Sequence, residues 1–568
     1  MRKIKAFAVL CFAIFVVAFN CSVYFGFGTV KAESPTTKTA IITGQNPDYE
    51  KFLQDYNNGD IEKYGEVFPS PAKRNFKITQ TKQSKIASLP ESYDPRPLGK
   101  MTSVKDQGAL DTCWDFAAVA AAETRVKKDE EEFDFSEEHI RFYLSNANPS
   151  SIYKRKPNEA GWVDAAANYM VNGSGVVLES ECPYVNAPNA PAPNLNITPT
   201  KIFTDTEEIP VTDLNAIKTA VTNYGAVAVS AQWPNNLNSY FNTSNFAFYF
   251  TDPNSEGHAI TIVGWDDNFA ASKFKTPYPS ANGAWLCKNS WGEAQMDGGY
   301  FWASYKTKFS NDCGIAFTKY IDYDENRKIV SYDSSIIGGA LAFPSNPIYA
   351  GNVFNISAQD SSSMSVQEVT FYSNCVQNYE IYIGSAVTSL GSTKYANGTT
   401  HLGWQTVKLN KQYVASNKYA VVIKFTNPMG LEDWGAAFEY GDTSLVVKNT
   451  SLGQGFLSYK MSTRSADWTD LKTFFIQNGQ SKYGNFMIKS VLLPKINGDE
   501  DNGDEEITNP ETEDPDETGD NEDDDFTDDA KKQKQKDIMF VGLVIAGIFV
   551  PIGVLYLIAA IATRRPKT

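Results

Sequence analysis

The chain has 568 residues, of which 42% are hydrophobic and 13% aromatic, enough for two or three packed domains and too many for a largely disordered protein. Its formal charge is −16, but residues 499–530 hold 18 acidic residues and no basic one, which leaves about +2 for the remainder. The acidity therefore belongs to one segment rather than to the folded parts, and we expect no nucleic-acid partner.

The N-terminus has the form of a secretory signal. Arg2, Lys3 and Lys5 precede an apolar stretch that reaches about Val23, and a small-residue cleavage pattern follows at residues 30–32. We therefore expect residues 1–32 to be a signal peptide and the segments after it to be exported.

A cysteine at the start of a predicted helix is the first chemical motif. Cys113-Trp114 opens an alanine-rich run to about Lys127, which has high helix propensity. The unpaired N–H groups at a helix N-terminus stabilise an anion, so this position favours a reactive thiolate with a lowered pKa. Gln107, six residues earlier, can donate its side-chain N–H to an oxyanion beside the backbone N–H of Cys113. A buried core cysteine is the alternative reading of an isolated Cys.

The second and third motifs supply an imidazole and an amide. His258 precedes the apolar run 259–265, where a strand would hold its ring rigidly, and it follows Cys113 by 145 residues, a separation typical of a nucleophile and base that meet through folding. Asn289 comes 31 residues later, and an amide oxygen that accepts the imidazole N–H fixes the ring's tautomer and direction. Trp291 is close enough in sequence to shield this pair.

The remaining two of the three histidines have less suitable surroundings. His139 follows Ser136, which has the form of a helix N-cap, so we expect His139 to be a surface residue in a first helical turn. His401 lies in a polar turn.

These segments resemble the papain family of cysteine peptidases. The matching stretches are residues 107–116, 257–259 and 289–292, with further likeness at 89–94, 158–162 and 298–301. The similarity spans roughly residues 89–320, and we assign the peptidase domain to residues 89–322.

The resemblance implies an α+β fold with two lobes and a cleft between them. A helical lobe would carry Cys113 and a β-rich lobe would carry His258 and Asn289. It further implies that these three residues are catalytic and that Gln107 and the Cys113 N–H bind the oxyanion. The backbone of Gly161 and Gly257 would bind the substrate peptide. No cofactor or metal is expected.

Several features depart from the family pattern. Leu110 stands where the family often has a disulfide cysteine, and nothing just before His258 can pair with Cys313, so we expect those bridges to be absent. Asp111 and Asp115 flank the nucleophile, where two carboxylates could either raise the pKa of the thiol or attract basic substrate side chains. Residues 33–88 resemble a short propeptide over the cleft, for which we expect self-cleavage near residues 84–88.

After the peptidase domain the sequence pattern becomes that of a β-sandwich. Short alternating or β-branched runs separated by Gly, Asn and Ser turns predict strands. They fall at residues 365–372, 379–383, 404–409, 418–426 and 485–493. Residues 323–494 resemble the lectin-like domain that follows the peptidase in clostridial surface-layer cysteine proteases. Trp404, Trp434, Tyr440 and Trp468 could stack on sugars or pack in a core, and we favour the core.

The C-terminal part predicts a membrane anchor. Residues 495–537 contain the acidic run and should form an extended, self-repelling linker. Residues 538–562 are apolar and uncharged over a length that can cross a bilayer, and residues 563–568 would form a cytoplasmic tail.

The resulting interpretation is a single-pass cell-membrane protein whose catalytic and β domains are extracellular. It would be an endopeptidase acting on polypeptide substrates, with surface or cell-wall carbohydrate as a candidate partner of residues 323–494. Two alternatives stay open: a catalytically silent adhesin that binds carbohydrate or cell wall, and a cysteine amidase acting on peptidoglycan stem peptides.

Overall fold

The computed structural model describes residues 39–74, 76, 89–129, 131–344, 347–428, 430–442, 444–448, 450–480 and 484–496. The expected signal peptide, the cleavage region near residues 84–88, the acidic linker beyond residue 496, the apolar segment 538–562 and the tail 563–568 lie outside these residues. No helix within them combines the length and apolarity needed to traverse a bilayer.

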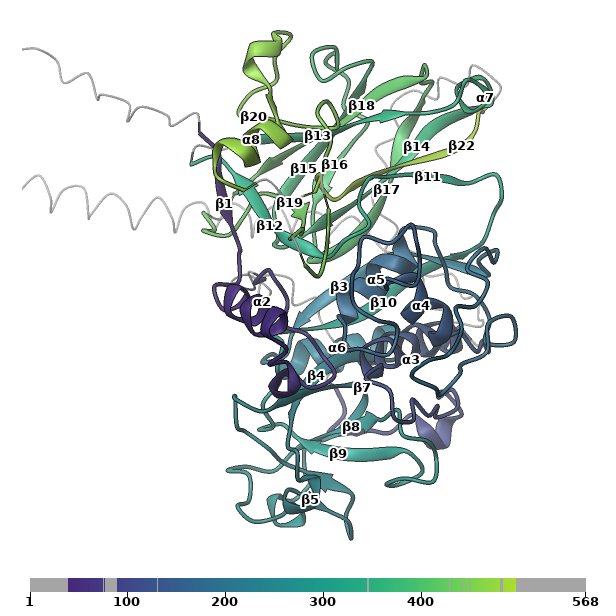
Figure 1. Ribbon diagram of the computed structural model, residues 1–568, viewed down its shortest axis with the longest axis vertical. Coiled ribbons are helices and arrows are strands. Elements are labelled where there is room, and N and C mark those ends of the chain that lie inside the picture. The colour runs from purple at the N-terminus through teal and green to yellow at the C-terminus, as the bar shows by residue number, and fades with distance from the viewer. Residues whose placement is uncertain are drawn as a thin grey trace, which may run out of the picture. The chain divides into compact units, whose positions relative to one another are not determined.

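Residues 39–74, which we call the prosegment, contact both of the domains that follow (Figure 1). Strand β1 (Ile41–Thr43) pairs antiparallel with β12 of the C-terminal domain. Helix α2 (Tyr49–Asn58) and the short 3-10 helix η1 (Glu62–Tyr64) come next. Phe52 of α2 is fully buried, and its ring lies 5.1 Å from Phe68 and 4.9 Å from Tyr64. An aromatic cluster therefore anchors the prosegment.

Three helices form the helical lobe: α3 (Cys113–Lys128), α4 (Glu137–Tyr143) and α5 (Val163–Val171). The small alanine side chains of α3 are buried on several faces, because α5 and strand β7 both pack closely against the helix. The predicted helix that begins at Cys113 is confirmed. Ser136 is confirmed as the N-cap of α4, since its Oγ accepts a hydrogen bond from the His139 N–H at 3.1 Å.

The β-rich lobe is built on a nine-stranded sheet with the order β3-β10-β4-β7-β8-β9-β6-β5, to which β2 is added beside β7. The strands are β2 (Ser92–Tyr93), β3 (Lys201–Pro210), β4 (Val227–Trp233), β5 (Phe241–Asn242), β6 (Ala247–Phe248), β7 (Glu256–Asp266), β8 (Ala284–Lys288), β9 (Tyr300–Ser304) and β10 (Cys313–Asp322). Helix α6 (Leu214–Tyr224) packs against this sheet. Strand β7 is buried from Gly257 to Trp265, which makes it a rigid support for the residues at its start.

The C-terminal domain contains a four-stranded sheet, β11-β22-β14-β17, a six-stranded sheet, β16-β15-β18-β13-β20-β21, and the small sheet β1-β12-β19. Its strands are β11 (Lys328–Val330), β12 (Ile337–Ala342), β13 (Ile348–Asn355), β14 (Met364–Ser373), β15 (Asn378–Gly384), β16 (Ala396–Thr399), β17 (Gly403–Tyr413), β18 (Lys418–Thr426), β19 (Ala436–Glu439), β20 (Gly455–Ser458), β21 (Thr469–Asp470) and β22 (Ile488–Pro494). Two short helices, α7 (Ala358–Ser363) and α8 (Leu471–Gln477), complete it.

The two larger sheets share one core, as a sandwich requires. Phe371 of β14 lies 5.2 Å from Tyr379 of β15 and 5.8 Å from Phe425 of β18, measured between ring centroids. Each of the five runs predicted as strands overlaps a strand of this domain. The four aromatic residues considered for sugar stacking are Trp404, Trp434, Tyr440 and Trp468, and all are buried, with 3%, 6%, 5% and 7% exposure. They pack in the core.

The five cysteines of the described residues, Cys113, Cys182, Cys287, Cys313 and Cys375, are all buried and all unpaired. The expected absence of the family's disulfides therefore holds in this part of the chain. Packing and hydrogen bonds, rather than cross-links, hold these two domains together.

Candidate active site

The sulfur of Cys113 lies at the first turn of α3 and faces the start of β7. The backbone N–H of Ala259 donates a hydrogen bond to Sγ at 3.1 Å, and the carbonyl oxygen of Glu66, from the prosegment, lies 4.0 Å from Sγ. The side chain is fully buried. Helix α3 thus delivers the sulfur to the junction between the two lobes.

His258 and Asn289 meet across neighbouring strands. The Nε2 atom of His258 lies 2.8 Å from the Oδ1 atom of Asn289, so an N–H at Nε2 donates to the amide oxygen and leaves Nδ1 facing the cysteine side. The rings of Trp291 and Trp233 lie 5.0 Å and 4.7 Å from the imidazole ring. These indoles cover the hydrogen bond and exclude water from it.

The side chain of Gln107 is held in one orientation. Its Oε1 accepts a hydrogen bond from the Ser290 hydroxyl at 2.6 Å, and its backbone N–H donates to the Ser290 carbonyl at 2.8 Å. The amide nitrogen therefore points the other way, where it donates to Leu110 O at 2.7 Å and to Glu66 Oε2 at 2.8 Å. The side chain is fixed as a donor before any substrate arrives.

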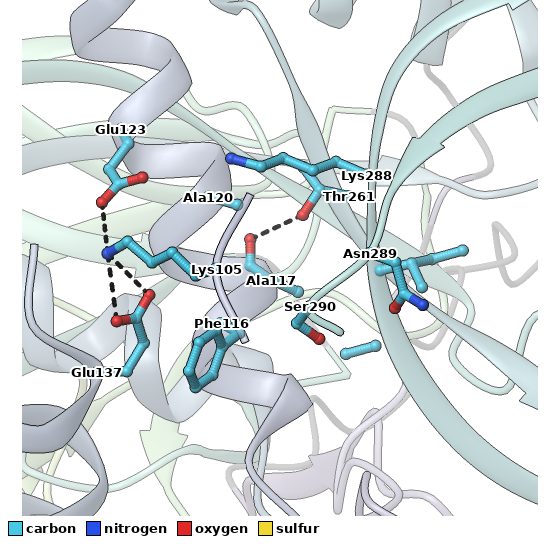
Figure 2. A pocket seen from close by; sticks show the side chains of 12 residues that line it. Lys105, Phe116, Ala117, Ala120, Glu123, Glu137, Thr261, Lys288, Asn289 and Ser290 are labelled. Carbon is cyan, nitrogen blue, oxygen red and sulfur yellow. Dashed lines mark hydrogen bonds and ion pairs between the residues drawn. The ribbon is translucent and has the colours of Figure 1, made fainter. Parts of the chain in front are cut away.

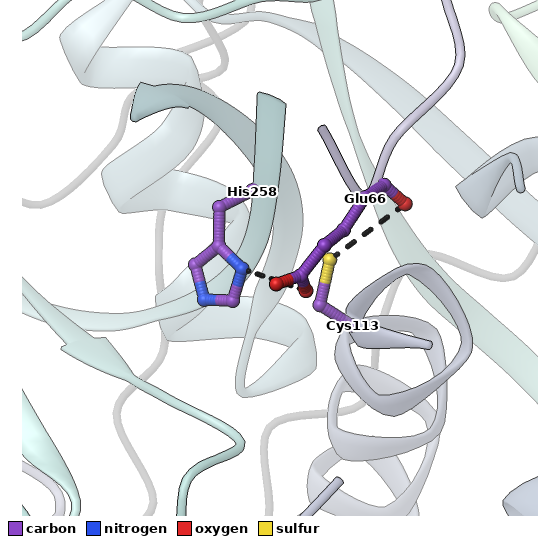
Figure 3. A group of neighbouring side chains, drawn as sticks. All are labelled: Glu66, Cys113 and His258. Carbon is purple, nitrogen blue, oxygen red and sulfur yellow. Dashed lines mark hydrogen bonds and ion pairs between the residues drawn. The ribbon is translucent and has the colours of Figure 1, made fainter. Parts of the chain in front are cut away.

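Glu66 is the residue that sequence reasoning missed. Its carboxylate lies between the cysteine and the histidine (Figure 3), and ligand atoms of Glu66, Cys113 and His258 all lie within 4.8 Å of one another. Oε2 is 3.2 Å from His258 Nδ1 and accepts the Gln107 donor at 2.8 Å. A negative oxygen thus occupies the place expected for the oxyanion, and the only sequence signal was that Glu66 falls in the expected propeptide.

The electrostatics are those of a blocked site. Burial raises the pKa of the Cys113 thiol well above its usual value, the charge of Glu66 raises it further, and Asp115 adds to the effect. Burial also acts to raise the pKa of Glu66, but His258, Gln107 and Cys113 together bring it below its usual value. The expected lowering of the Cys113 pKa by the helix terminus is therefore wrong for this state, because the sulfur is buried and an anion lies beside it.

The prosegment backbone follows both glycines expected to bind substrate. The Glu66 N–H donates to Gly257 O at 3.0 Å and the Phe68 N–H donates to Gly161 O at 2.9 Å. A Cβ atom at Gly161 would lie 2.5 Å from the Trp114 ring, so glycine is required where the chain passes over the indole. The expected substrate path is thus occupied along its length by residues 65–69.

A buried charge network holds the helical lobe against the β-rich lobe near this site (Figure 2). Lys105 Nζ lies 2.8 Å from Glu123 and 3.1 Å from Glu137, and the Thr261 hydroxyl donates to Ala117 O at 3.2 Å. Burial lowers the pKa of Lys288, whose ammonium donates to Thr102, to about 8. These contacts fix α3 relative to β7 and β8, and so fix Cys113 relative to His258 and Asn289.

The other two histidines lie away from the cleft. His139 is fully buried, so the expectation of a surface residue is wrong: its Nδ1 is 2.6 Å from the Tyr169 hydroxyl, and α4 packs that first turn inward. His401 Nε2 lies 3.1 Å from Thr206 O, where the β domain meets strand β3.

The two carboxylates beside the nucleophile have different surroundings. Asp115 is fully buried in α3, so it cannot attract a substrate side chain. Asp111 is accessible to solvent. Partial desolvation of its carboxyl group, together with Glu66 and other nearby carboxylates, raises its pKa to about 6. Attraction of basic substrates therefore stays a prediction for Asp111 alone.

Comparison with known proteins agrees with this geometry. Residues 89–322 match the family model of papain family cysteine proteases, and residues 329–491 match that of the lectin like domain. Fruit bromelain of Ananas comosus is 28% identical over 240 residues, which is 41% of this chain and 60% of bromelain. The chain therefore spans less than two thirds of the length of that relative.

Two solved structures extend the likeness over both domains. The cysteine protease and lectin-like domains of Cwp84, a surface layer associated protein of Clostridium difficile, superpose with a TM-score of 0.68 at 26% identity, covering 80% of this chain and 98% of that one. A clostridial Cwp84 structure after propeptide cleavage gives a TM-score of 0.62 at 26% identity, covering 71% and 99%.

Fold, site and matches together define residues 89–322 as a papain-family cysteine protease domain. More particularly, a lectin-like domain follows the peptidase domain, as in the surface-layer protease Cwp84.

Proposed function

We propose that this protein is an extracytoplasmic, membrane-anchored cysteine endopeptidase that hydrolyses peptide bonds of surface or extracellular proteins. The observation that carries the proposal is the convergence of a helix-terminal sulfur, an amide-oriented imidazole and a fixed side-chain N–H donor in one water-shielded place. Each of these groups has a separate task in acyl transfer, and together they supply the nucleophile, the general acid and base, and the oxyanion donor.

The chemistry begins once Glu66 has left the site. Nδ1 of His258 takes the thiol proton, and the Cys113 thiolate attacks the substrate carbonyl. Gln107 and the Cys113 N–H donate to the oxyanion, and the imidazolium, held by Asn289, gives its proton to the leaving amine. The imidazole then deprotonates the water that releases the acyl-enzyme.

The proposed location is supported by the sequence. A signal peptide at residues 1–32 exports the chain, and residues 538–562 hold it to the membrane through a single pass. The acidic linker 495–537 separates the folded domains from the bilayer, which suits a protease that reaches substrates at the cell surface.

The deciding experiment is labelling of the processed chain, from which the prosegment has been removed, with an epoxysuccinyl inhibitor that alkylates an activated cysteine, followed by mass spectrometry and peptide-substrate profiling. Incorporation at Cys113 with hydrolysis, both absent from Cys113→Ala, is the expected result. A protein with its prosegment removed that neither reacts nor hydrolyses any peptide would instead be the silent adhesin.

Two observations favour the peptidase over the alternatives. The adhesin alternative included sugar stacking on four aromatic residues of the β domain, and all four are buried. The peptidoglycan amidase would not need the indole cover that Trp291 gives to the His258–Asn289 hydrogen bond. A muropeptide digest separates the amidase, since only that enzyme would cleave stem peptides and spare proteins.

A further inference from the structure

The prosegment has a second charged anchor besides Glu66. The side chain of Arg74 is 1% exposed, and its guanidinium binds two carboxylates of the peptidase domain. Nε donates to Glu208 Oε2 at 2.8 Å, and Nη2 donates to Asp164 Oδ2 at 3.1 Å and to Glu208 Oε1 at 3.3 Å. Two of its nitrogens thus contact both oxygens of Glu208, the forked geometry in which guanidinium binds best.

This anchor is close to the path expected for substrate. Arg74 Nη1 donates to the Ser70 hydroxyl at 2.6 Å, so the guanidinium lies beside a residue only two positions from Phe68, whose N–H binds Gly161. A cavity of about 20 Å³ is lined in part by Phe68, Trp162, Asp164 and Arg74. Departure of Phe68 and Arg74 with the prosegment would enlarge this space, so that a long side chain of a peptide that follows the Gly161 edge could reach the position of this guanidinium.

The receptor for Arg74 belongs to the peptidase domain and stays when the prosegment leaves. Glu208 lies near the end of β3, with its side chain 3% exposed, and Asp164 lies in the first turn of α5. The backbone N–H of Arg74 also donates to Asp312 at 3.3 Å. Burial raises the pKa of Asp164, and Arg74 opposes that rise. Loss of Arg74 leaves two closely spaced carboxylates in a dehydrated place, which a new cation would stabilise.

We propose that Asp164 and Glu208, once freed from Arg74, bind a basic side chain of the polypeptide substrate, with arginine preferred to lysine. The preference follows because a planar guanidinium can contact both oxygens of Glu208 and also Asp164, whereas an ammonium is a single charge. The substrate role rests on the proposed peptidase function.

The kinetic test profiles the processed full chain against peptides that carry Arg, Lys or Gln at each position on the acyl side of the scissile bond. At one position we expect Arg to exceed Gln in kcat/KM by about tenfold or more, as for a charged hydrogen bond. Glu208→Gln and Asp164→Asn should lose this ratio, and Glu207→Gln, at the position just before Glu208 on β3, should retain it. An active enzyme with no Arg preference, or with one that Glu208→Gln leaves intact, overturns the inference and leaves the proposed function standing.

A second test needs no catalysis. In full-length Cys113→Ala carrying Arg74→Ala, n-propylguanidinium at millimolar concentration should raise Tm more than n-propylurea does, and the added Glu208→Gln substitution should remove the difference. Equal effects of the two compounds would show that the pocket takes no free cation, which also overturns the inference. A rise in Tm with n-propylguanidinium in this variant, combined with no hydrolysis of any peptide by the processed wild-type chain, would overturn the proposed function and the substrate role together.

Discussion

Glu66 explains how the catalytic groups can be assembled and blocked at the same time. Its carboxylate receives the hydrogen bond from Gln107 that an oxyanion would receive, but a carboxylate carbon is not attacked by a thiolate. The backbone carbonyl oxygen of Glu66 lies 4.0 Å from the sulfur, and the Gln107 donor is turned to the Glu66 side chain instead. The prosegment can therefore cross the site without being cut there.

Binding of the prosegment should depend on pH through Glu66. Its pKa lies below the usual value of 4.5 in the bound state, so its contribution is complete above pH 4.5 and is lost as the pH falls through the lowered pKa. In full-length Cys113→Ala, hydrogen exchange of residues 62–70, corrected for the intrinsic rate, should increase below that pH.

Two variants control this measurement. Glu66→Gln should show fast exchange at every pH, because the amide carries no negative charge beside His258, and Glu62→Gln, at an exposed position nearby, should keep the wild-type profile. Identical profiles for wild type and Glu66→Gln would show that the carboxylate does not control release.

The donor role assigned to Gln107 predicts a specific kinetic defect. Gln107→Ala in the processed enzyme should lower kcat by about 10²–10³ with little change in KM, because the donor acts mainly on the charge of the transition state. Gln295→Ala, an exposed glutamine in the neighbouring loop, should be unchanged. An equal rise in KM with constant kcat would instead assign Gln107 to ground-state binding.

At the scale of elements, α2 holds residues 65–69, which block the cleft, in place. The helix has a polar exposed face, and its buried Phe52 packs on Phe68 and Tyr64 at either end of the blocking stretch. Residues 65–69 have few backbone contacts with the cleft, so their position depends on this aromatic cluster and on β1.

Phe52→Ala should therefore activate the full chain. Removing a fully buried phenyl ring costs about 3–5 kcal/mol, which is expected to destabilise the docked prosegment more than the peptidase domain. Labelling of Cys113 by the epoxysuccinyl inhibitor at neutral pH should become faster, and Gln54→Ala on the exposed face of α2 should label at the wild-type rate. Unchanged labelling of Phe52→Ala would mean that β1, Glu66 and Arg74 hold the prosegment without the cluster.

At the scale of the whole molecule, buried polar contacts join the peptidase and the β domain. Asn168 of α5 donates to Ser335 O at 2.7 Å and accepts from Lys489 Nζ of β22 at 3.3 Å. Lys489 also pairs with Asp333, and both side chains are fully buried. Strand β17 adds a hydrogen bond from Trp404 N–H to Thr206 at 3.0 Å.

Breaking the Lys489–Asp333 pair should lower the stability of the two domains together. Lys489→Ala leaves a buried carboxylate without its cation, and we expect a loss of about 3–5 kcal/mol in the free energy of unfolding, measured by denaturant titration. The double variant Lys489→Met with Asp333→Leu removes both charges and should be less destabilised than Lys489→Ala. A single substitution that costs nothing would show that water reaches the pair.

Much of this protein could be predicted from local sequence because local physical rules decide it. The alanine-rich run after Cys113, the Ser136 cap and the alternating strands of the β domain express propensities and periodicities that tertiary contacts did not override. The expected chemistry of the cysteine, histidine, asparagine and glutamine was likewise readable, because acyl transfer uses those residue types and their pattern along the chain resembles that of the papain family.

The tertiary structure decided the rest, because contacts between distant segments leave no local pattern. Nothing in the sequence around Glu66 or Arg74 marks them as residues that bind in the cleft of the peptidase domain. The raised pKa of the Cys113 thiol follows first from its burial and then from the charge of Glu66. The N-cap at Ser136 predicted an exposed position for His139, but α5 packs against that turn and buries it. The residue types determined what chemistry this chain can perform. Packing of the prosegment determined which side chains now contact the catalytic groups and block them.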